Sequence, residues 1–434
     1  MINVNICSIF CFSEGNQLIS EKKRGLDKNL EYNQGFISSN SYELFWFIQI
    51  SDTQFLWYSN QRIADFYEFL NETYKTITPL FIYNTGDLVN TYYGAQQNKD
   101  EWELYKKALD DNSMNTSIYM DVIGNHDAME DPNFEYFLNY SMMGISFNTT
   151  QYSFNKTFNF GNYAFIGLNT AKKSYNLFEF GFQGFLSSEE LDWYENELEK
   201  YKEFEKIFVF GHHPPSYPPF YKIISEESST GKDFYELNEE HNVSYYFSGH
   251  IHSNSIQYLN ELLSITTSNF DQNNGVYRII SLDNNSLSTS VGYVGVWPQA
   301  IITHPSGEEY LFRDLYVKGK KIRVLAWDPK GIISVKWGLF DNKGEYQIMN
   351  WQSLEKIYED SPLWEGNLDF QYRGNLLLKV KIDGGSGETL KILNYNLKKE
   401  ISVFSLSVAI IMVIGLISIS VIINYYLLKQ VKKK

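Results

Sequence analysis

Five short apolar runs, each followed directly by polar side chains, dominate the first 250 residues of the chain. They are rich in Phe, Ile, Val and Tyr, and each is too short to be a typical helix. The runs are residues 45–51, 79–85, 118–123, 206–210 and 243–248. We predict that each is a buried β-strand, whose carboxyl end delivers polar residues into a loop at one edge of a sheet.

Segments with apolar residues at helical spacing separate these strands. Residues 62–70 and 100–109 show this spacing and should pack on the sheet. Residues 186–198 begin with a serine cap and an acidic first turn, which is a strong helix start signal. Residues 152–154 and 163–169 are predicted strands, with a hairpin turn at 161–162. This mixture predicts an α/β fold.

The pattern changes after Trp297. Alternating apolar and polar residues mark further strands at 320–327, 331–340 and 375–383, with Asp, Pro, Asn and Gly at the turns between them. Short strands at this spacing predict a small all-β sandwich over residues 297–397, immunoglobulin-like in architecture but without a Cys pair. The preceding α/β region would span residues 43–296.

The far end of the chain has a different character. Residues 401–428 carry no charged side chain and consist largely of Ile, Val and Leu, which predicts one C-terminal transmembrane helix. The lysine-rich segment 429–434 that follows predicts a basic cytoplasmic tail, although Lys398 and Lys399 on the other side weaken that bias.

Residues 1–42 are expected to form a signal peptide and a loosely ordered lead-in. The apolar stretch at 6–12 supports a signal peptide, but no basic residue precedes it, so cleavage is left open. Seven Asn-x-Ser/Thr sites, the acceptor sequence for N-glycans, favour a lumenal or extracellular body on an endomembrane or the plasma membrane. They are Asn71, Asn115, Asn139, Asn148, Asn155, Asn242 and Asn284. The alternative is a tail-anchored cytosolic protein.

Charge and missing motifs narrow the functional classes. The 434 residues carry a formal net charge of −15, which argues against non-specific nucleic-acid binding. The sequence contains no Gly-x-Ser-x-Gly elbow and no phosphate-binding Gly-Lys-Ser/Thr loop. Serine-hydrolase and P-loop chemistry therefore have no support.

The residues that follow the five strands are unusually rich in metal-ligand types. Five of the seven histidines of the chain occur there. Because the carboxyl ends of such strands meet at one edge of an α/β fold, we predict that these loops build a single site. Its candidate residues are Asp52, Gln54, Asp87, Asn125, His126, Asp127, His212, His213, His250 and His252.

In order along the chain, these blocks resemble those of the calcineurin-like metallophosphoesterases. The family pattern is Asp-x-His, Gly-Asp-x-x-Asp/Asn, Gly-Asn-His-Asp/Glu, Gly-His and Gly-His-x-His. All five blocks are present over residues 43–296, but Gln54 stands where the family usually has His. The resemblance implies a four-layer α/β/β/α sandwich. Together with the β-sandwich and the apolar segment, it is similar to the transmembrane branch of the family.

The resemblance also implies a role for each candidate. Asp87 would bridge two divalent metal ions. The first ion would add Asp52, Gln54 and His252, and the second would add Asn125, His212 and His250. His126 would be catalytic and would be oriented by Asp127. His213 is left open between substrate binding and loop packing.

The implied activity is hydrolysis of a phosphomonoester, phosphodiester or nucleotide-type substrate by attack of metal-bound hydroxide. An amide oxygen from Gln54 favours manganese at the first position, with iron, zinc or magnesium as alternatives. The competing hypothesis is a catalytically inactive membrane protein of the same fold that acts as a binding or scaffold module.

Overall fold

The computed structural model describes residues 31–56, 58–92, 95–172, 183–217, 221–270, 275–307, 321–368 and 374–397. The predicted signal sequence at 6–12, the apolar segment 401–428 and the tail 429–434 lie outside these ranges. Across the ranges that are described, none of the helices combines the length and apolar character needed to cross a membrane.

The first of two central sheets is built around β3 (Glu43–Ile50). β3 runs parallel to β4 (Ile82–Asn84), which runs parallel to β5 (Tyr119–Asp121). On its other side β3 is antiparallel to β15 (Val276–Asp283), which pairs with β16 (Ser286–Tyr293). The predicted strands at 45–51, 79–85 and 118–123 are therefore confirmed, although the second and third are only three residues long.

The start of the described chain is more ordered than expected. β1 (Glu31–Asn33) and β2 (Phe36–Ser38) form a hairpin, and β2 pairs with the first half of β3. The expectation of a loosely ordered lead-in is wrong for these residues. Ile37 is fully buried, and its apolar side chain extends the core of the first sheet.

The second central sheet has six strands. β9 (Lys206–Phe210) and β12 (Tyr245–Ser248) lie next to each other in parallel, and both confirm strands predicted from the sequence. In sheet order the strands are β13 (Ser255–Leu259), β14 (Leu262–Thr266), β12 (Tyr245–Ser248), β9 (Lys206–Phe210), β7 (Gly161–Gly167) and β6 (Tyr152–Phe158). The predicted hairpin turn is misplaced by two residues: Gly161 and Asn162 are paired within β7, opposite Phe158 and Thr157.

The two sheets pack face to face, and aromatic side chains fill the space between them. Phe47 from the first sheet lies 5.8 Å from Phe247 and 5.9 Å from Phe208 in the second, measured between ring centroids. Alternate residues of β3 point the other way: Trp46 and Ile48 belong to a second core beneath the helices. This burial of both faces explains why the strand reads as a continuous apolar run.

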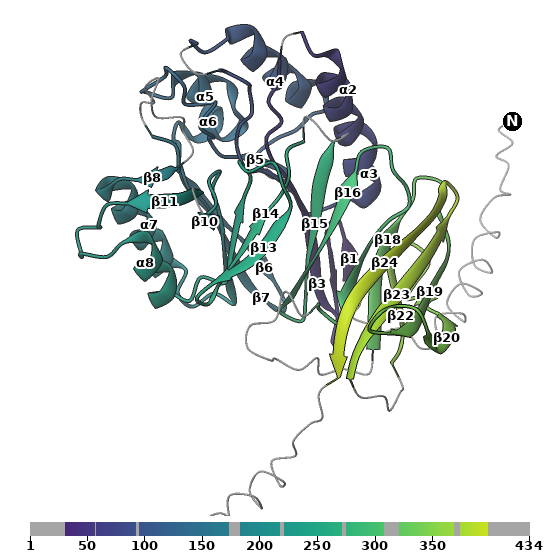
Figure 1. Cartoon of the computed structure of the whole chain (residues 1–434). Helices are drawn as coiled ribbons and strands as arrows, with labels where there is room; N and C mark the ends of the chain where they lie inside the picture. The colour runs from purple at the N-terminus through teal and green to yellow at the C-terminus, as the bar shows by residue number, and fades with distance from the viewer. Residues whose placement is uncertain are drawn as a thin grey trace, which may run out of the picture.

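Helices cover the outer face of each sheet (Figure 1). The outer faces are covered by α2 (Asn60–Glu68), η1 (Phe69–Thr73), α3 (Tyr74–Ile77), α4 (Lys99–Asp111), α5 (Glu135–Tyr140) and α6 (Met142–Phe147) on the first sheet, and by α7 (Ser188–Lys200) and α8 (Phe234–Glu240) on the second. A small sheet of β8 (Gly184–Leu186), β10 (Ser216–Tyr217) and β11 (Tyr221–Ser225) lies beside α7. The α/β/β/α arrangement is therefore confirmed, as is the serine cap: the Ser187 hydroxyl accepts from the backbone N–H of Glu190 at the start of α7.

The C-terminal region forms two further sheets, as predicted. Their strands are β17 (Gln299–His304), β18 (Lys321–Trp327), β22 (Leu363–Asn367) and β21 (Glu355–Lys356) in one, and β20 (Gln347–Ser353), β19 (Ile332–Asp341), β23 (Gly374–Gly384) and β24 (Gly387–Leu397) in the other. A separate apolar core, which includes Trp337, Val324 and Ile382, lies between them.

This all-β part packs directly on the first central sheet. Trp327 lies 5.9 Å from Trp46, measured between ring centroids, and belongs to the same core as the helices. Arg323 is almost fully buried at the junction, where its guanidinium donates to Asp283 Oδ1 at 2.7 Å and to Glu365 Oε2 at 3.0 Å. Since one apolar core continues across the junction, the two parts are held together firmly.

Candidate metal centre

The loops that follow β3, β4, β5, β9 and β12 meet at one edge of the two sheets. Five of the seven predicted metal ligands have a left-handed backbone, which is costly for residues other than glycine. Their φ angles are 52° for Asp52, 41° for Gln54, 54° for Asp87, 70° for His250 and 48° for His252. Strained backbone of this kind persists where the surrounding fold over-determines it, so these loops are held tightly in place.

Asp87 lies at the centre of the cluster and is almost fully buried. Its Oδ2 is 3.2 Å from Nε2 of His212, and its Oδ1 accepts from the backbone N–H of His126 at 3.0 Å. Ligand atoms of Asp87, His212 and His250 all lie within 4.8 Å of one another. The structure therefore brings together three of the predicted ligands in one candidate metal-binding group.

His212 shows why this group needs a cation. Its Nδ1 lies 2.9 Å from the carbonyl oxygen of Thr85, which can only accept, so Nδ1 carries the hydrogen. Its Nε2 then presents a lone pair toward Asn125 Oδ1 at 2.9 Å and Asp87 Oδ2 at 3.2 Å. Lone pairs that converge without a positive charge between them repel one another, so a proton or a metal ion must occupy the space.

The pKa shifts of these side chains follow from this crowding. Burial lowers the pKa of His212, but the nearby Asp87 carboxylate outweighs it and raises that pKa to about 9. For Asp87, burial raises the pKa, but the imidazoles of His212 and His126 outweigh it and hold it well below its usual range. The pKa of His250 lies well below its ordinary value because of burial and the neighbouring imidazoles. The raised pKa of His212 thus indicates that this position favours a positive charge.

Asp52 and His252 form the second part of the cluster. Asp52 is fully buried, and its Oδ2 accepts from the backbone N–H of His250 at 3.0 Å. Its Oδ1 faces Nε2 of His252 at 3.2 Å and makes no hydrogen bond within the described residues. Gln54 is buried next to them, and its backbone N–H donates to the Asp87 carbonyl oxygen at 2.9 Å. Coordination by the Gln54 amide stays a prediction.

His126 and Asp127 do not interact in the expected way. Nδ1 of His126 lies 2.8 Å from the carbonyl oxygen of Thr91, so the backbone of that loop orients the ring. The carboxylate of Asp127 instead accepts from the backbone N–H groups of Leu88, Val89 and Gly124 at 2.8–3.1 Å. The expectation that Asp127 orients His126 is therefore corrected. Asp127 instead links the loop that follows β4 to the loop that follows β5.

The environment of Asp127 is consistent with that structural role. Burial and the neighbouring Asp87 carboxylate raise its pKa to about 7, although the backbone N–H groups that it accepts from act in the opposite direction. The ring of His126, by contrast, is partly exposed, and its Nε2 lies 3.9 Å from Asp87 Oδ2. His126 is thus placed at the mouth of the cluster, while Asp127 lies beneath it.

His213 lies deep beside the cluster and is fully buried. Its ring centroid is 4.6 Å from that of His250, and its Nδ1 lies 2.9 Å from the hydroxyl of Thr170. The backbone N–H of His213 also donates to the Thr170 hydroxyl. These contacts fix the ring against the metal group, and a direct contact with substrate stays a prediction.

Several residues that shape the site were not identified from the sequence. Thr85 and Thr91 act through backbone carbonyls, which any residue could supply. Gln49 links the two sheets below the site, because its amide nitrogen donates to the Ser248 carbonyl and its amide oxygen accepts from Thr267. Gly249, by contrast, could be found in the sequence, because it begins the Gly-His-Ile-His block. The structure shows why glycine is needed there: a Cβ would collide with Ser51 Oγ and Asp52 Oδ2.

The donor set fits divalent transition metals. It combines carboxylate oxygens, an amide oxygen and imidazole nitrogens, which are the types that manganese, iron and zinc bind in proteins. The second ring nitrogen of His212 is fixed by a carbonyl, as is typical of metal-bound histidines. Asp87, His212 and His250 would hold one ion, with Asn125 adjacent.

Comparison with known proteins agrees with this geometry. Residues 45–254 match the family model described as calcineurin-like phosphoesterase. The chain therefore contains a calcineurin-like metallophosphoesterase domain, and the resemblance predicted from the five sequence blocks is confirmed.

The individual relatives that the chain matches share only about a quarter of its residues over the aligned regions. The chain is 24% identical over 322 residues to Transmembrane protein 62 of Mus musculus, which covers 68% of this chain and 47% of that protein. It is 27% identical over 235 residues to “Putative metallophosphoesterase At3g03305” of Arabidopsis thaliana, covering 49% of this chain and 30% of that protein. The chain thus spans about half or less of the length of these curated relatives.

Among solved structures, the chain is similar to one titled “GAP50 the anchor in the inner membrane complex of Plasmodium”. The sequence identity is 16% and the TM-score is 0.38, with 58% of this chain and 85% of that chain covered.

Proposed function

We propose that this chain is a membrane-anchored phosphoesterase that uses two divalent metal ions to hydrolyse a phosphomonoester, a phosphodiester or a nucleotide-type substrate. The observation that carries the proposal is the convergence of Asp87, His212 and Asn125, whose electron-pair donors face one another at 2.9–3.2 Å in a buried site. A buried arrangement of this kind is unfavourable unless a cation is bound.

In this proposal Asp87 would contribute to both metal positions. Asp52, Gln54 and His252 would complete the first position, and Asn125, His212 and His250 would complete the second. Two such ions would supply Lewis-acid stabilisation of the phosphoryl oxygens and a nucleophile at neutral pH. The partly exposed imidazole of His126 is placed to donate a proton to the leaving oxygen.

A binding or scaffold protein without turnover is the competing function. The geometry favours the enzyme because the charged candidate ligands Asp52 and Asp87 are both present and buried. A pure scaffold has no need to keep two carboxylates in a strained, left-handed backbone.

The decisive experiment uses the full chain in detergent, stripped of metal and reloaded with manganese. We expect turnover of nitrophenyl phosphomonoesters or phosphodiesters and close to two bound ions per chain. Asp87→Asn removes the shared anion, so hydrolysis should fall to background and metal content should drop. Asp110→Asn makes the same change on the exposed face of α4 and should change neither.

Two outcomes would contradict this proposal. If Asp87→Asn kept both its metal and near wild-type turnover, the assignment of the bridging carboxylate would be wrong. If the manganese-loaded wild-type protein hydrolysed none of these substrates but still bound two ions, the scaffold function would be the better one.

The location of the protein is part of the proposal. Residues 401–428 would span a membrane, with the tail 429–434 in the cytoplasm and the body in the lumen or outside the cell. Two observations support this arrangement. A mouse relative is named a transmembrane protein, and all seven Asn-x-Ser/Thr asparagines are exposed, so the folded body has room for a glycan at each.

A further inference from the structure

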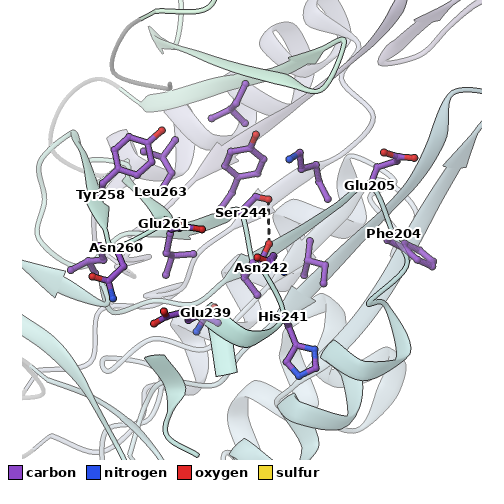
Figure 2. Close-up of a pocket in the computed structure, with 18 of the residues that line it drawn as sticks. Phe204, Glu205, Glu239, His241, Asn242, Ser244, Tyr258, Asn260, Glu261 and Leu263 are labelled. Atoms are coloured by element: carbon purple, nitrogen blue, oxygen red, sulfur yellow. Dashed lines mark hydrogen bonds between the residues drawn. The ribbon is translucent and has the colours of Figure 1, made fainter. Parts of the chain in front are cut away.

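A hollow of about 520 Å³ lies where strands of the second sheet begin, at the opposite end of these strands from the metal centre. It is bordered by the N-terminal ends of β9 and β12, the end of α8, and the turn between β13 and β14. Figure 2 shows most of the side chains that line it. No residue proposed to bind metal or substrate contributes to its wall.

The chemistry of the wall suits a neutral ligand that is rich in hydroxyl groups. Tyr258 and Phe204 present partly exposed aromatic rings, on which the apolar face of a sugar ring can pack. Lys206 supplies hydrogen-bond donors, and Glu205 and Glu261 supply acceptors. Acidic and basic side chains both contribute, so neither an anion nor a cation is strongly preferred.

Two Asn-x-Ser sites from distant parts of the chain border this hollow. Asn242 and Ser244 lie in its wall, and so do Asn285 and Ser286 of the site that begins at Asn284. In Figure 2, Asn242 lies between Tyr258 and Glu261 on one side and Phe204 on the other. This juxtaposition comes from the fold and cannot be seen in the sequence.

Asn242 is the better placed of the two asparagines. It follows the C-terminus of α8 with a φ of 50°, and its side chain is exposed. It contributes to the wall itself, whereas Asn284 is not among the wall residues. A sugar attached to Asn242 therefore starts inside the rim of the hollow.

We propose that Asn242 carries an N-glycan whose first sugars occupy this hollow. In the transfer step, Nδ2 of Asn242 forms a bond to the anomeric carbon of a lipid-pyrophosphate-linked oligosaccharide. The bond from that carbon to the pyrophosphate breaks, the lipid pyrophosphate leaves, and the nitrogen loses one proton. The inference depends on the lumenal or extracellular location of the body but not on the phosphoesterase activity.

The test compares two sites in the full chain isolated from its native cells. Asn139 is the matched control, because it is an exposed acceptor on α5, away from the hollow. Glycopeptide mass spectrometry follows removal of the glycan at each site by an N-glycosidase. In the native protein, removal at Asn242 should be about tenfold slower than at Asn139, which corresponds to about 1.4 kcal/mol of contact free energy. After denaturation, the two rates should be equal.

A second readout does not depend on the glycosidase. Ser244→Ala prevents modification but keeps Asn242, so it should increase the labelling of Lys206 by an amine-reactive reagent. The matched variant Ser141→Ala would disturb a helix cap, so Asn139→Gln is the control, and it should leave Lys206 labelling unchanged.

Three outcomes would contradict the inference that a glycan on Asn242 occupies the hollow. Modification at Asn139 with an unmodified Asn242 would overturn the inference and leave the lumenal location intact. Equal native removal rates at both sites, with unchanged Lys206 labelling in Ser244→Ala, would show that the hollow holds no sugar. If no site on the chain were modified, both the inference and the lumenal location would fall, while the phosphoesterase proposal would stand.

Discussion

At the scale of single residues, the proposed function divides the site into groups that would hold metal and one group, His126, that would move a proton. The ring of His126 is suited to the second role because the Thr91 carbonyl fixes it and it is partly exposed. Its neighbour Asp127 is fully buried, and its carboxylate accepts hydrogen bonds from backbone N–H groups. Adjacent residues in one sequence block thus have different physical roles.

The first prediction follows from that separation. His126→Ala should retain both metal ions but lower kcat by roughly 10²–10⁴-fold, as expected for loss of a general acid. The loss should be much smaller with a nitrophenolate leaving group, which needs no proton. His241→Ala, outside the site, is the control. Equal losses with good and poor leaving groups would argue against proton donation.

Gln54 gives a prediction about metal preference. An amide oxygen favours manganese or magnesium over zinc, so metal titration should show one tight and one weaker step. Gln54→His should tighten the weaker step and shift the preference toward zinc or iron. Gln61→His, on the exposed side of α2, makes the same change as a control. An unchanged titration in Gln54→Ala would mean that Gln54 is not a ligand.

How much of the site could be read from the sequence depends on the kind of contact. Asp87, His212 and His250 could be identified as candidate ligands from their residue types alone, and the structure places them together. The Thr85 and Thr91 contacts use backbone carbonyls, which leave no trace in residue identity. The family resemblance also implied that Asp127 orients His126, but the carboxylate of Asp127 points to the backbone N–H groups of Leu88, Val89 and Gly124.

At the scale of elements, strands that are buried on both faces were the easiest to predict. β3, β9 and β12 form continuous apolar runs because helices cover one face and the other sheet covers the second. The short hairpin of β1 and β2 was missed because its strands have three residues each and depend on pairing with β3. Such pairing is set by tertiary contact and not by local pattern.

The contact between β24 and β16 leads to a prediction about pH. Lys391 on β24 donates to the Ser290 hydroxyl at 2.8 Å, and burial lowers its pKa from 10.5 to about 8. Between these values the unfolded chain binds more protons than the folded chain. The free energy of unfolding should therefore gain a contribution that rises with pH from about 8 to 10.5.

Denaturant unfolding at several pH values would measure this contribution. Lys391→Met should remove it, so the difference in unfolding free energy between wild type and variant should change across that window. Lys343→Met, at an exposed turn, should leave the difference flat. A flat difference for Lys391→Met as well would mean that the Lys391 ammonium is well solvated in the folded protein.

At the scale of the whole molecule, the α/β body and the all-β sheets share one apolar core through Trp46 and Trp327. The sequence predicted both parts, because the change from short continuous apolar runs to strands of alternating apolar and polar residues is clear after Trp297. It could not predict their junction. Arg323 finds its partners Asp283 and Glu365 only in the folded structure, 40 and 42 residues away along the chain.

The topology prediction belongs to this scale. If the body is lumenal or extracellular, treating the protein from its native cells with an N-glycosidase should increase its gel mobility. In sealed microsomes the body should resist added protease, and detergent should remove that protection. A body that is digested without detergent and shows no mobility shift would be cytosolic.

The two ends of the central strands face in opposite directions. The metal centre follows the carboxyl end of β3, near α2, whereas β24 reaches its last residue, Leu397, at the other end of the body (Figure 1). β3 has 8 residues, so this strand alone is about 27 Å long. If, as proposed, residues 401–428 cross a bilayer, the chain would leave the described body from the end that is opposite to the metal centre. A substrate dissolved in water could then reach the metal centre without first meeting the bilayer.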